Sequence, residues 1–322
     1  MLGLILAASI NAAFGNALQG DGRAAIATLR ALDASELSEK SRPIRTCMLD
    51  RLDKRTLPKS TIADDKLIDA VLRTYQEYWM RSLRAEQAAD ANQAWLLATL
   101  NTIAGEKAPD LDALEPKLQA QIEAHGWHSL HGLTLPLREF MLWKSETPKQ
   151  YDVQLPEGRV QPVTVTFMDG FASLGWAAFA TCDAAHSGGW TKPEGLYAVA
   201  PAYDVNSESF RVSYLAHEAQ HFHDGTHFPG IEQPELEYRA KLTELAIAHD
   251  TAYLLLENFS ENVGVDHAAP HSWANAQVVA QMRLGLFGRS GGRWREAQVA
   301  RINNVALQLL KADTQKRLAP TP

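Results

Sequence analysis

The sequence lacks several features that mark particular classes of protein. It has 31 Lys and Arg against 38 Asp and Glu, a net charge of −7, so the basic excess of a nucleic-acid-binding protein is missing. It has no long run of like charges and no internal repeat. No apolar stretch inside the chain reaches the roughly 18 residues of a transmembrane helix. What is left is ordinary globular composition, and 322 residues suffice for one large domain or two smaller ones.

Cysteine is also scarce, with only Cys47 and Cys182 and no CxxC pair. In an exported protein these two residues can form one disulfide that closes a long loop. In a cytoplasmic protein they are two buried thiols. The residues themselves leave both possibilities open.

The N-terminus, MLGLILAASINAAFGNA, is rich in apolar residues and ends in small residues around Gly15 and Ala17. This pattern predicts a secretory signal peptide at 1–17, and we therefore expect a periplasmic or secreted protein with no integral membrane segment after its removal. A signal peptide usually begins with positive charge, but no Lys or Arg precedes Arg23. If this segment is instead a buried helix, the protein is cytoplasmic.

The rest of the chain changes its periodicity twice. Apolar residues recur at spacings of three and four in the first part, so we predict a helical N-terminal region at 18–132. A second region at 133–322 begins with β-branched and aromatic runs around a predicted hairpin turn and then returns to helical periodicity. We expect the fold class to be α+β, with a small mixed sheet between two helical parts. The segments predicted in the second region are strands around a turn at 156–159, a short strand at 195–203, and helices from Ser207 and at 234–258, 272–287 and 293–318.

Two stretches of the chain are rich in histidine. The first, HGWHSLHG at 125–132, is flanked by glycines and predicts a loop rather than a second metal site. The second, YLAHEAQHFHDGTHF at 214–228, lies on a predicted amphipathic helix. Here His217 and His221 are four residues apart, so both imidazoles project from one face of the helix, as two ligands of one ion require.

Glu218 stands next to His217 and completes the H-E-x-x-H pattern. A glutamate at this position is too near its neighbour to ligate easily, but it can touch a water bound to the metal. In such sites zinc lowers the pKa of the water and the glutamate accepts the proton. We expect Glu218 to stay free of the metal and to act as the base.

One candidate for the third ligand is His227. The spacing His217–His221–His227 matches the H-E-x-x-H-x-x-G-x-x-H pattern of metzincins. However, Asp224 occupies the glycine position, and the glycine comes one residue later. The family's methionine turn is also missing, because Met282 lies in a predicted helix.

The other candidate is Glu237, near the start of the helix that Pro234 is expected to open. With Ala240 three residues after it, this part of the chain resembles the gluzincins, zinc peptidases whose ligands are the two histidines of H-E-x-x-H and a downstream glutamate. The resemblance covers about residues 195–250. Glu235 and Glu244 lie on the same predicted helix, and Glu244 is the better alternative of the two.

The resemblance implies a zinc metallopeptidase with one Zn²⁺ per chain, held by His217, His221 and Glu237. It would hydrolyse peptide bonds in a peptide or protein substrate, with a metal-bound water activated by Glu218. The substrate is expected to pair with the strand at 195–203. The alternative is a helical binding or scaffold protein with a structural zinc or an inactive zincin fold. The sequence carries no signal for the oligomeric state.

Four further residues near the motif carry weaker hypotheses. We expect His223 to lie at the surface. Asp224 either orients a ligand histidine or helps to end the helix. His267 and His271 are candidates for stabilising the transition state, a role that a His or Tyr takes in gluzincins, although each is more typical of a loop residue.

Overall fold

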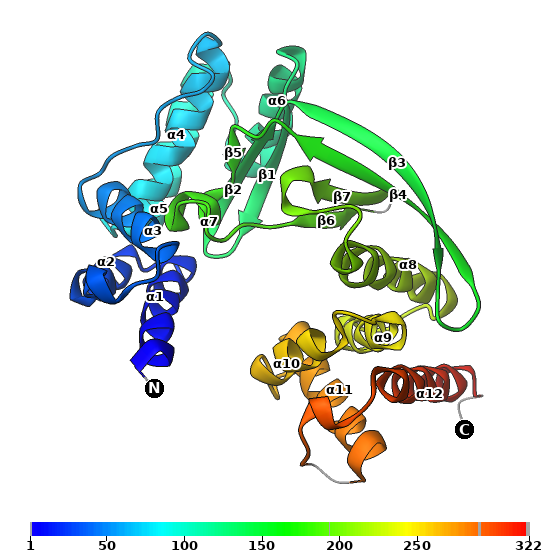
Figure 1. The fold of residues 1–322 in the computed structure, drawn as a ribbon. Coiled ribbons are helices and arrows are strands. Elements are labelled where there is room, and N and C mark those ends of the chain that lie inside the picture. The colour runs from blue at the N-terminus through cyan, green and yellow to red at the C-terminus, as the bar shows by residue number, and fades with distance from the viewer. Residues whose placement is uncertain (1, 193, 289–290, 320–322) are drawn as a thin grey trace. The chain divides into compact units, whose positions relative to one another are not determined.

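The computed structural model describes residues 2–192, 194–288 and 291–319, with the side chains of residues 2–9 and 36 left out. The fold is α+β, as the sequence predicts, with helices first, small sheets in the middle of the chain and helices last (Figure 1). The chain divides into two compact units. Unit 1 comprises Met1–Glu146 and Met168–Gly188, and unit 2 comprises Thr147–Phe167 and Gly189–Pro322.

Unit 1 is mainly helical, and its helices begin where the sequence supplies caps. The side chains of Asp21, Asp65 and Asp110 each accept a hydrogen bond from the backbone N–H three residues on, which satisfies a donor that the helix itself leaves unpaired. Gly105 adopts a left-handed conformation (φ 67°) that ends one helix. The helices are α1 (Leu2–Leu18), α2 (Gly22–Ala31), α3 (Ser41–Met48), α4 (Lys66–Leu83), α5 (Ala89–Ala104), α6 (Leu111–Ala124) and α7 (Trp176–Thr181).

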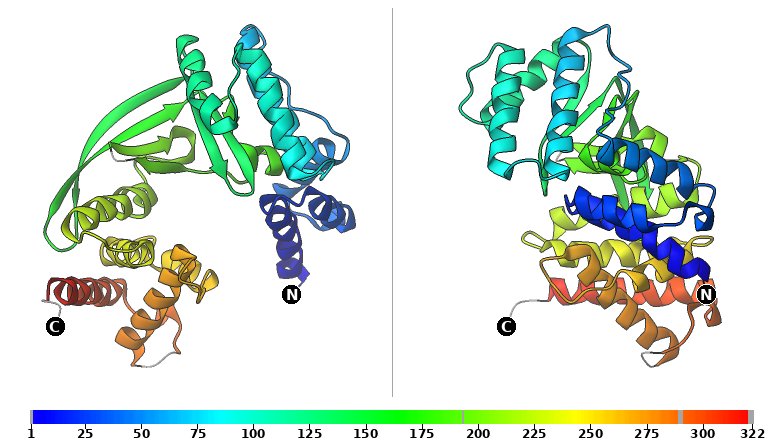
Figure 2. Two further views of the ribbon diagram at one scale, coloured as in Figure 1. Left: turned by 180° about the vertical axis from the view of Figure 1, so that it is seen from behind. Right: turned by 90° about the vertical axis from the view of Figure 1, so that its left-hand side faces the viewer.

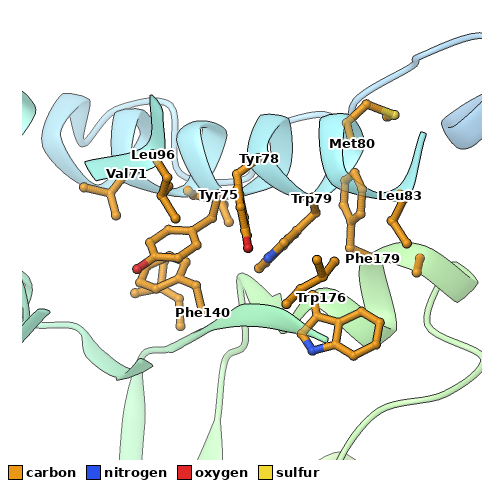
Figure 3. Close-up of a cluster of buried hydrophobic side chains, with 14 of the residues drawn as sticks. Val71, Tyr75, Tyr78, Trp79, Met80, Leu83, Leu96, Phe140, Trp176 and Phe179 are labelled. Atoms are coloured by element: carbon orange, nitrogen blue, oxygen red, sulfur yellow. The ribbon is translucent and has the colours of Figure 1, made fainter. Parts of the chain in front are cut away.

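The core of unit 1 forms along the aromatic face of α4 (Figure 3). Tyr75 stacks on Phe140 with ring centroids 4.5 Å apart, and Trp79 lies 5.4 Å from Phe179. All four side chains are buried, and each such burial contributes about 1.5–3 kcal/mol. This packing fixes α4 against the sheet and α7.

The sheet of unit 1 is antiparallel, in the order β1-β2-β5, with β1 (His128–Thr134), β2 (Leu137–Trp143) and β5 (Ser173–Leu174). The loop predicted at 125–132 was therefore wrong from His128 onward. Gly126 turns with φ 69° after α6, and His128 then pairs with Trp143. The apolar β2 run supplies backbone partners that the local composition of 125–132 does not reveal.

Cys47 and Cys182 form a disulfide with Cα atoms 6.2 Å apart, which joins the last turn of α3 to the end of α7. The bond is compatible with an oxidising compartment. In the part of the chain that the structure describes, no helix is long and apolar enough to cross a membrane. Removal of residues 1–17 stays a prediction, and it would withdraw the buried Ala13 and Ala17 from the core of unit 1.

The sheet of unit 2 has the order β3-β4-β7-β6, with β3 (Ser145–Gln154), β4 (Val160–Asp169), β6 (Gly189–Lys192) and β7 (Gly195–Val199). The predicted hairpin turn is confirmed, because the N–H of Leu155 donates to the carbonyl of Arg159 at 2.8 Å and Gly158 has φ 81°. The strand predicted at 195–203 ends at Val199, and a 3₁₀ turn follows it. β6 was not predicted.

The helices of unit 2 are α8 (His217–His227), α9 (Gln233–Ile247), α10 (Ala252–Glu261), α11 (Pro270–Phe287) and α12 (Val299–Leu318) (Figures 1 and 2). The predicted helix 234–258 is thus two helices. Glu208 accepts hydrogen bonds from the backbone N–H groups of His249 and Thr251, and so satisfies donors in the turn between α9 and α10. One apolar cluster lies between the sheet and the segment leading into α8, and another among α9, α10, α11 and α12.

Candidate metal centre

The segment that leads into the H-E-x-x-H motif is a tight helical run. The hydroxyl of Ser207 accepts a hydrogen bond from the N–H of Phe210 at 3.1 Å, as the predicted helix start requires. A π-helical segment, Phe210–Ala216, follows and passes directly into α8. Such π segments are often found at functional sites. α8 then carries both histidines on one face, and the two Nε2 atoms are 3.0 Å apart.

Glu237 reaches the same point from α9. Pro234 lies in the first turn of this helix, as predicted, and Glu237 follows one turn later. Its carboxylate lies 3.5 Å from Nε2 of His217 and 3.4 Å from Nε2 of His221. One ligand atom from each of the three residues lies within 4.8 Å of the others. The structure therefore brings together the three side chains that the sequence singled out, and this group could bind a metal ion.

The donor set fits a metal better than it fits a set of ordinary hydrogen bonds. Oε2 of Glu237 is buried and makes no hydrogen bond that meets the usual geometry within the described residues, although it forms an ion-pair contact of 2.8 Å with Nδ1 of His271. Nδ1 of His217 lies 2.8 Å from Glu244 Oε1, so its proton is held there and Nε2 is left to face the centre. Two imidazoles and a carboxylate are one of the protein ligand sets found at catalytic zinc sites.

The charges at the centre favour a cation. Burial disfavours the charged form of His217, but Glu237 and Glu244 outweigh it and raise the pKa of His217 to about 10. Burial also opposes the charge of Glu237, yet the nearby imidazoles of His217, His221 and His271 hold the pKa of this carboxyl well below its usual range. Without an ion, the two carboxylates thus favour a proton on His217. The same negative charge would attract a divalent cation.

Glu218 lies outside this group, as expected for a base. Its half-buried side chain contacts β6, where Oε2 accepts a hydrogen bond from the hydroxyl of Thr191 at 2.8 Å. A helix turns by about 100° per residue, which separates Glu218 from the direction of His217. Thr191 is a site residue that sequence reasoning missed, because β6 was not predicted.

Two tyrosines beside Glu218 were also missed. The ring centroids of Tyr203 and Tyr214 are 4.7 Å apart. Burial, assisted by the negative charge of Glu218, raises the pKa of Tyr203 to about 12. The hydroxyl of Tyr214 is buried and has no hydrogen-bond partner in the part of the chain that the structure describes. The available signal was the helical spacing, since Tyr214 stands four residues before Glu218.

His227 does not join the metal group. α8 continues through Asp224 and the following glycine to His227, so the chain makes no turn back toward His217. Nδ1 of His227 lies 2.8 Å from the carbonyl oxygen of His223, and its ring stacks on that of His223 with centroids 3.9 Å apart. His223 itself is only 7% exposed, so its predicted surface position was wrong.

Asp224 has neither of its two predicted roles. It is fully buried, it lies inside α8, and its carboxylate forms a two-point contact with Arg239 at 2.7 and 3.0 Å. It also accepts a hydrogen bond from Gln220 at 2.8 Å. Arg239 donates further to Asp313 of α12. The carboxylate that contacts a candidate ligand histidine is instead that of Glu244, which the sequence suggested only as a ligand.

The two histidines considered for transition-state stabilisation lie in different surroundings. His271, in the first turn of α11, reaches Glu237 at the metal group. His267 lies 3.3 Å from Glu235 and 3.9 Å from Glu232, within a second His–Glu–Glu group that is mostly exposed. Of these two histidines, His271 is therefore the one next to the three candidate ligands.

No protein-family model, no curated protein and no solved structure matches this chain. The resemblance to gluzincins accordingly rests on the residues of α8 and α9.

Proposed function

We propose that the protein is a zinc-dependent metallopeptidase of the gluzincin type. The observation that carries the proposal is the convergence of His217, His221 and Glu237 at one point while Glu218, next in sequence to a ligand, is turned to β6. Two histidines and one carboxylate leave a zinc ion an open position, which catalysis needs and a structural site does not.

Zinc at this centre would supply a Lewis acid that polarises the scissile carbonyl and lowers the pKa of a water. Residues of the chain would transfer the proton, orient a ligand and stabilise the negative charge. Oε2 of Glu218, oriented by Thr191, takes a proton from the attacking water and returns it to the leaving amine. Glu244 holds the ring of His217 through Nδ1. His271 is adjacent and can donate to the oxygen that becomes negative.

The substrate cannot pair with the strand at 195–203, as the sequence led us to expect. β7, which contains most of the predicted strand 195–203, lies inside the sheet between β4 and β6. An extended peptide that adds to a sheet does so at an edge. β6 is at the edge of the described sheet and carries Thr191, the residue that contacts Glu218. We therefore place the peptide substrate along β6.

The test is Glu218→Gln, which keeps the shape of the side chain but removes its ability to accept a proton. The purified variant should retain about one zinc per chain, while peptide hydrolysis falls on the order of 100- to 10,000-fold. Glu261→Gln, at an exposed position at the end of α10, is the matched control and should behave like the parent.

Activity of Glu218→Gln within a few-fold of the parent would show that Glu218 is not the base. A parent protein that binds zinc but cleaves no member of a peptide library would favour the alternative, a scaffold with a structural zinc.

A further inference from the structure

Unit 1 contains a cavity of about 230 Å³ that the proposed peptidase chemistry does not use. Its walls come from the end of the α3 region, from α4, from the segment around β5 and from α7. Its lining includes Arg51, Gln76, Trp79, Phe179 and Asp183. The Cys47–Cys182 disulfide ties two of these walls together next to Asp183, so the cavity is held in shape by a covalent link.

The buried side chain of Gln76 indicates that the cavity binds a polar group. It is 7% exposed, and its Oε1 has no hydrogen-bond partner within the described residues. Its neighbours on the buried face of α4 are mostly aliphatic and aromatic, where a leucine would pack without leaving a polar atom unpaired. A buried carbonyl oxygen without a partner is costly. An N–H donor from a bound molecule would satisfy it.

Arg51 supplies a positively charged hydrogen-bond donor, where Gln76 supplies an acceptor. One N–H of its guanidinium donates to the carbonyl of Phe179 at 2.7 Å, and the guanidinium lies 5.0 Å from the centroid of the Phe179 ring. Burial lowers the pKa of Arg51, although the charge of Asp183 partly offsets this effect. The fork of a guanidinium matches a carboxylate, which would also neutralise this partly buried charge.

The remaining walls are apolar and aromatic. The rings of Trp79 and Phe179, both labelled in Figure 3, are tilted by 52° with centroids 5.4 Å apart. The indole N–H of Trp79 already donates to the carbonyl of Arg138. These rings offer apolar surface to a ligand. The volume lies below the roughly 300–1,000 Å³ of pockets for drug-sized molecules, so the ligand is small.

We propose that this cavity binds an α-amino-acid group with an apolar side chain. The carboxylate pairs with Arg51, an N–H on the neighbouring carbon donates to Oε1 of Gln76, and the side chain packs against the aromatic wall. The group can come from a free amino acid, whose ammonium would face Asp183, or from the C-terminal residue of a peptide. This inference is independent of the zinc centre in unit 2.

The experiment is isothermal titration calorimetry of the full chain with three probes: L-phenylalanine, N-acetyl-L-phenylalanine and L-phenylalaninamide. The first should bind saturably and the amide, which lacks the carboxylate, should not. Binding of the acetyl compound as well would identify the C-terminal residue of a peptide as the natural source. Its failure to bind would identify the free amino acid.

Two variants locate the site. Gln76→Leu and Arg51→Met should each weaken binding of L-phenylalanine by about tenfold or more. Because Arg51 also bonds Phe179, its loss can affect folding, whereas Gln76→Leu should melt no lower than the parent. Gln119→Leu, at an exposed position on α6, is the matched control.

The proposal is overturned if neither carboxylate probe binds, if the amide binds as tightly as the free acid, or if Gln76→Leu leaves the affinity unchanged. None of these results bears on zinc content.

Discussion

Two histidine-rich stretches of this chain look alike in sequence and differ completely in the folded protein. In 125–131 the histidines are three residues apart and fall on the end of α6 and on β1. In a strand, residues three apart point to opposite faces. His125, which precedes the strand, lies 2.9 Å from Asp65. Within the strand, His128 stacks on Trp143 with centroids 6.0 Å apart, and His131 bonds Ser129 at 2.9 Å.

The second stretch places His217 and His221 on a helix at a spacing of four, where the same residue type converges to 3.0 Å. The charge of each histidine depends on the groups around its ring. Burial lowers the pKa of His131 to about 3, whereas Glu237 and Glu244 overcome burial and raise that of His217 to about 10. Burial alone thus keeps a histidine neutral, whereas carboxylates on a neighbouring helix favour a positive charge at a buried histidine.

The largest difference between the stretches should appear in zinc content. His217→Ala should reduce bound zinc from about one per chain to almost none, because it removes a ligand. His128→Ala, in the other stretch, should leave it unchanged. Zinc can be measured by atomic emission after dialysis. If His128→Ala lost the metal and His217→Ala kept it, the centre would belong to 125–131 and the comparison would be reversed.

The next effect separates the two candidates for the third ligand. Glu237→Ala should weaken zinc binding by more than the roughly 10- to 100-fold typical of residues that only orient a ligand. His227→Ala should change it little, because its ring stacks on His223. Competition with a chromophoric chelator gives both affinities, and Gln233→Ala, at an exposed position at the start of α9, serves as the control. The opposite order of the two effects would restore the metzincin-like ligand set.

A smaller effect is expected from Glu244, which contacts Nδ1 of His217 rather than the centre. Glu244→Gln keeps a hydrogen-bond acceptor but removes the charge, so zinc affinity should fall by about 10- to 100-fold. The same chelator assay measures it. A loss as large as that of Glu237→Ala would indicate that Glu244 is itself a ligand.

A separate effect, on stability rather than on zinc affinity, is the pH dependence expected from the first stretch. The pKa of His131 is about 3 in the folded protein and about 6.5 when unfolded. The unfolded state therefore binds more protons between these values, and stability is present above pH 6.5 and is lost as the pH falls toward 3. His131→Gln should remove a slope on the order of 1 kcal/mol per pH unit in this window.

Urea unfolding of the parent and the variant at several pH values measures that difference. Glu115, whose pKa burial raises to about 7, has the opposite slope between pH 4.5 and 7 but is present in both proteins. Parallel curves for parent and variant would contradict the neutral, buried state of His131.

Much of the local structure follows from the sequence by itself. Aspartate caps, the turn at 156–159, the proline that opens α9 and the pairing of His217 with His221 on one helix face depend on neighbours within a few residues. These signals are local because helix and turn hydrogen bonds close over three or four residues. The α+β class could be predicted on the same basis, whereas the choice of Glu237 over its helix neighbours came from the resemblance to gluzincins.

Other features are decided only by the tertiary structure, because they depend on residues that are distant in the chain. β1 and β6 become strands because other strands pair with them, and β6 rather than β7 then forms the sheet edge. Glu237 and Glu244 are seven residues apart and share a face of α9, so sequence spacing cannot assign their roles. The packing of α9 on α8, which includes the buried Arg239–Asp224 pair, places Glu237 at Nε2 of His217 and Glu244 at Nδ1. Helix rotation and separation are set by side-chain packing across the interface, and no local pattern encodes them.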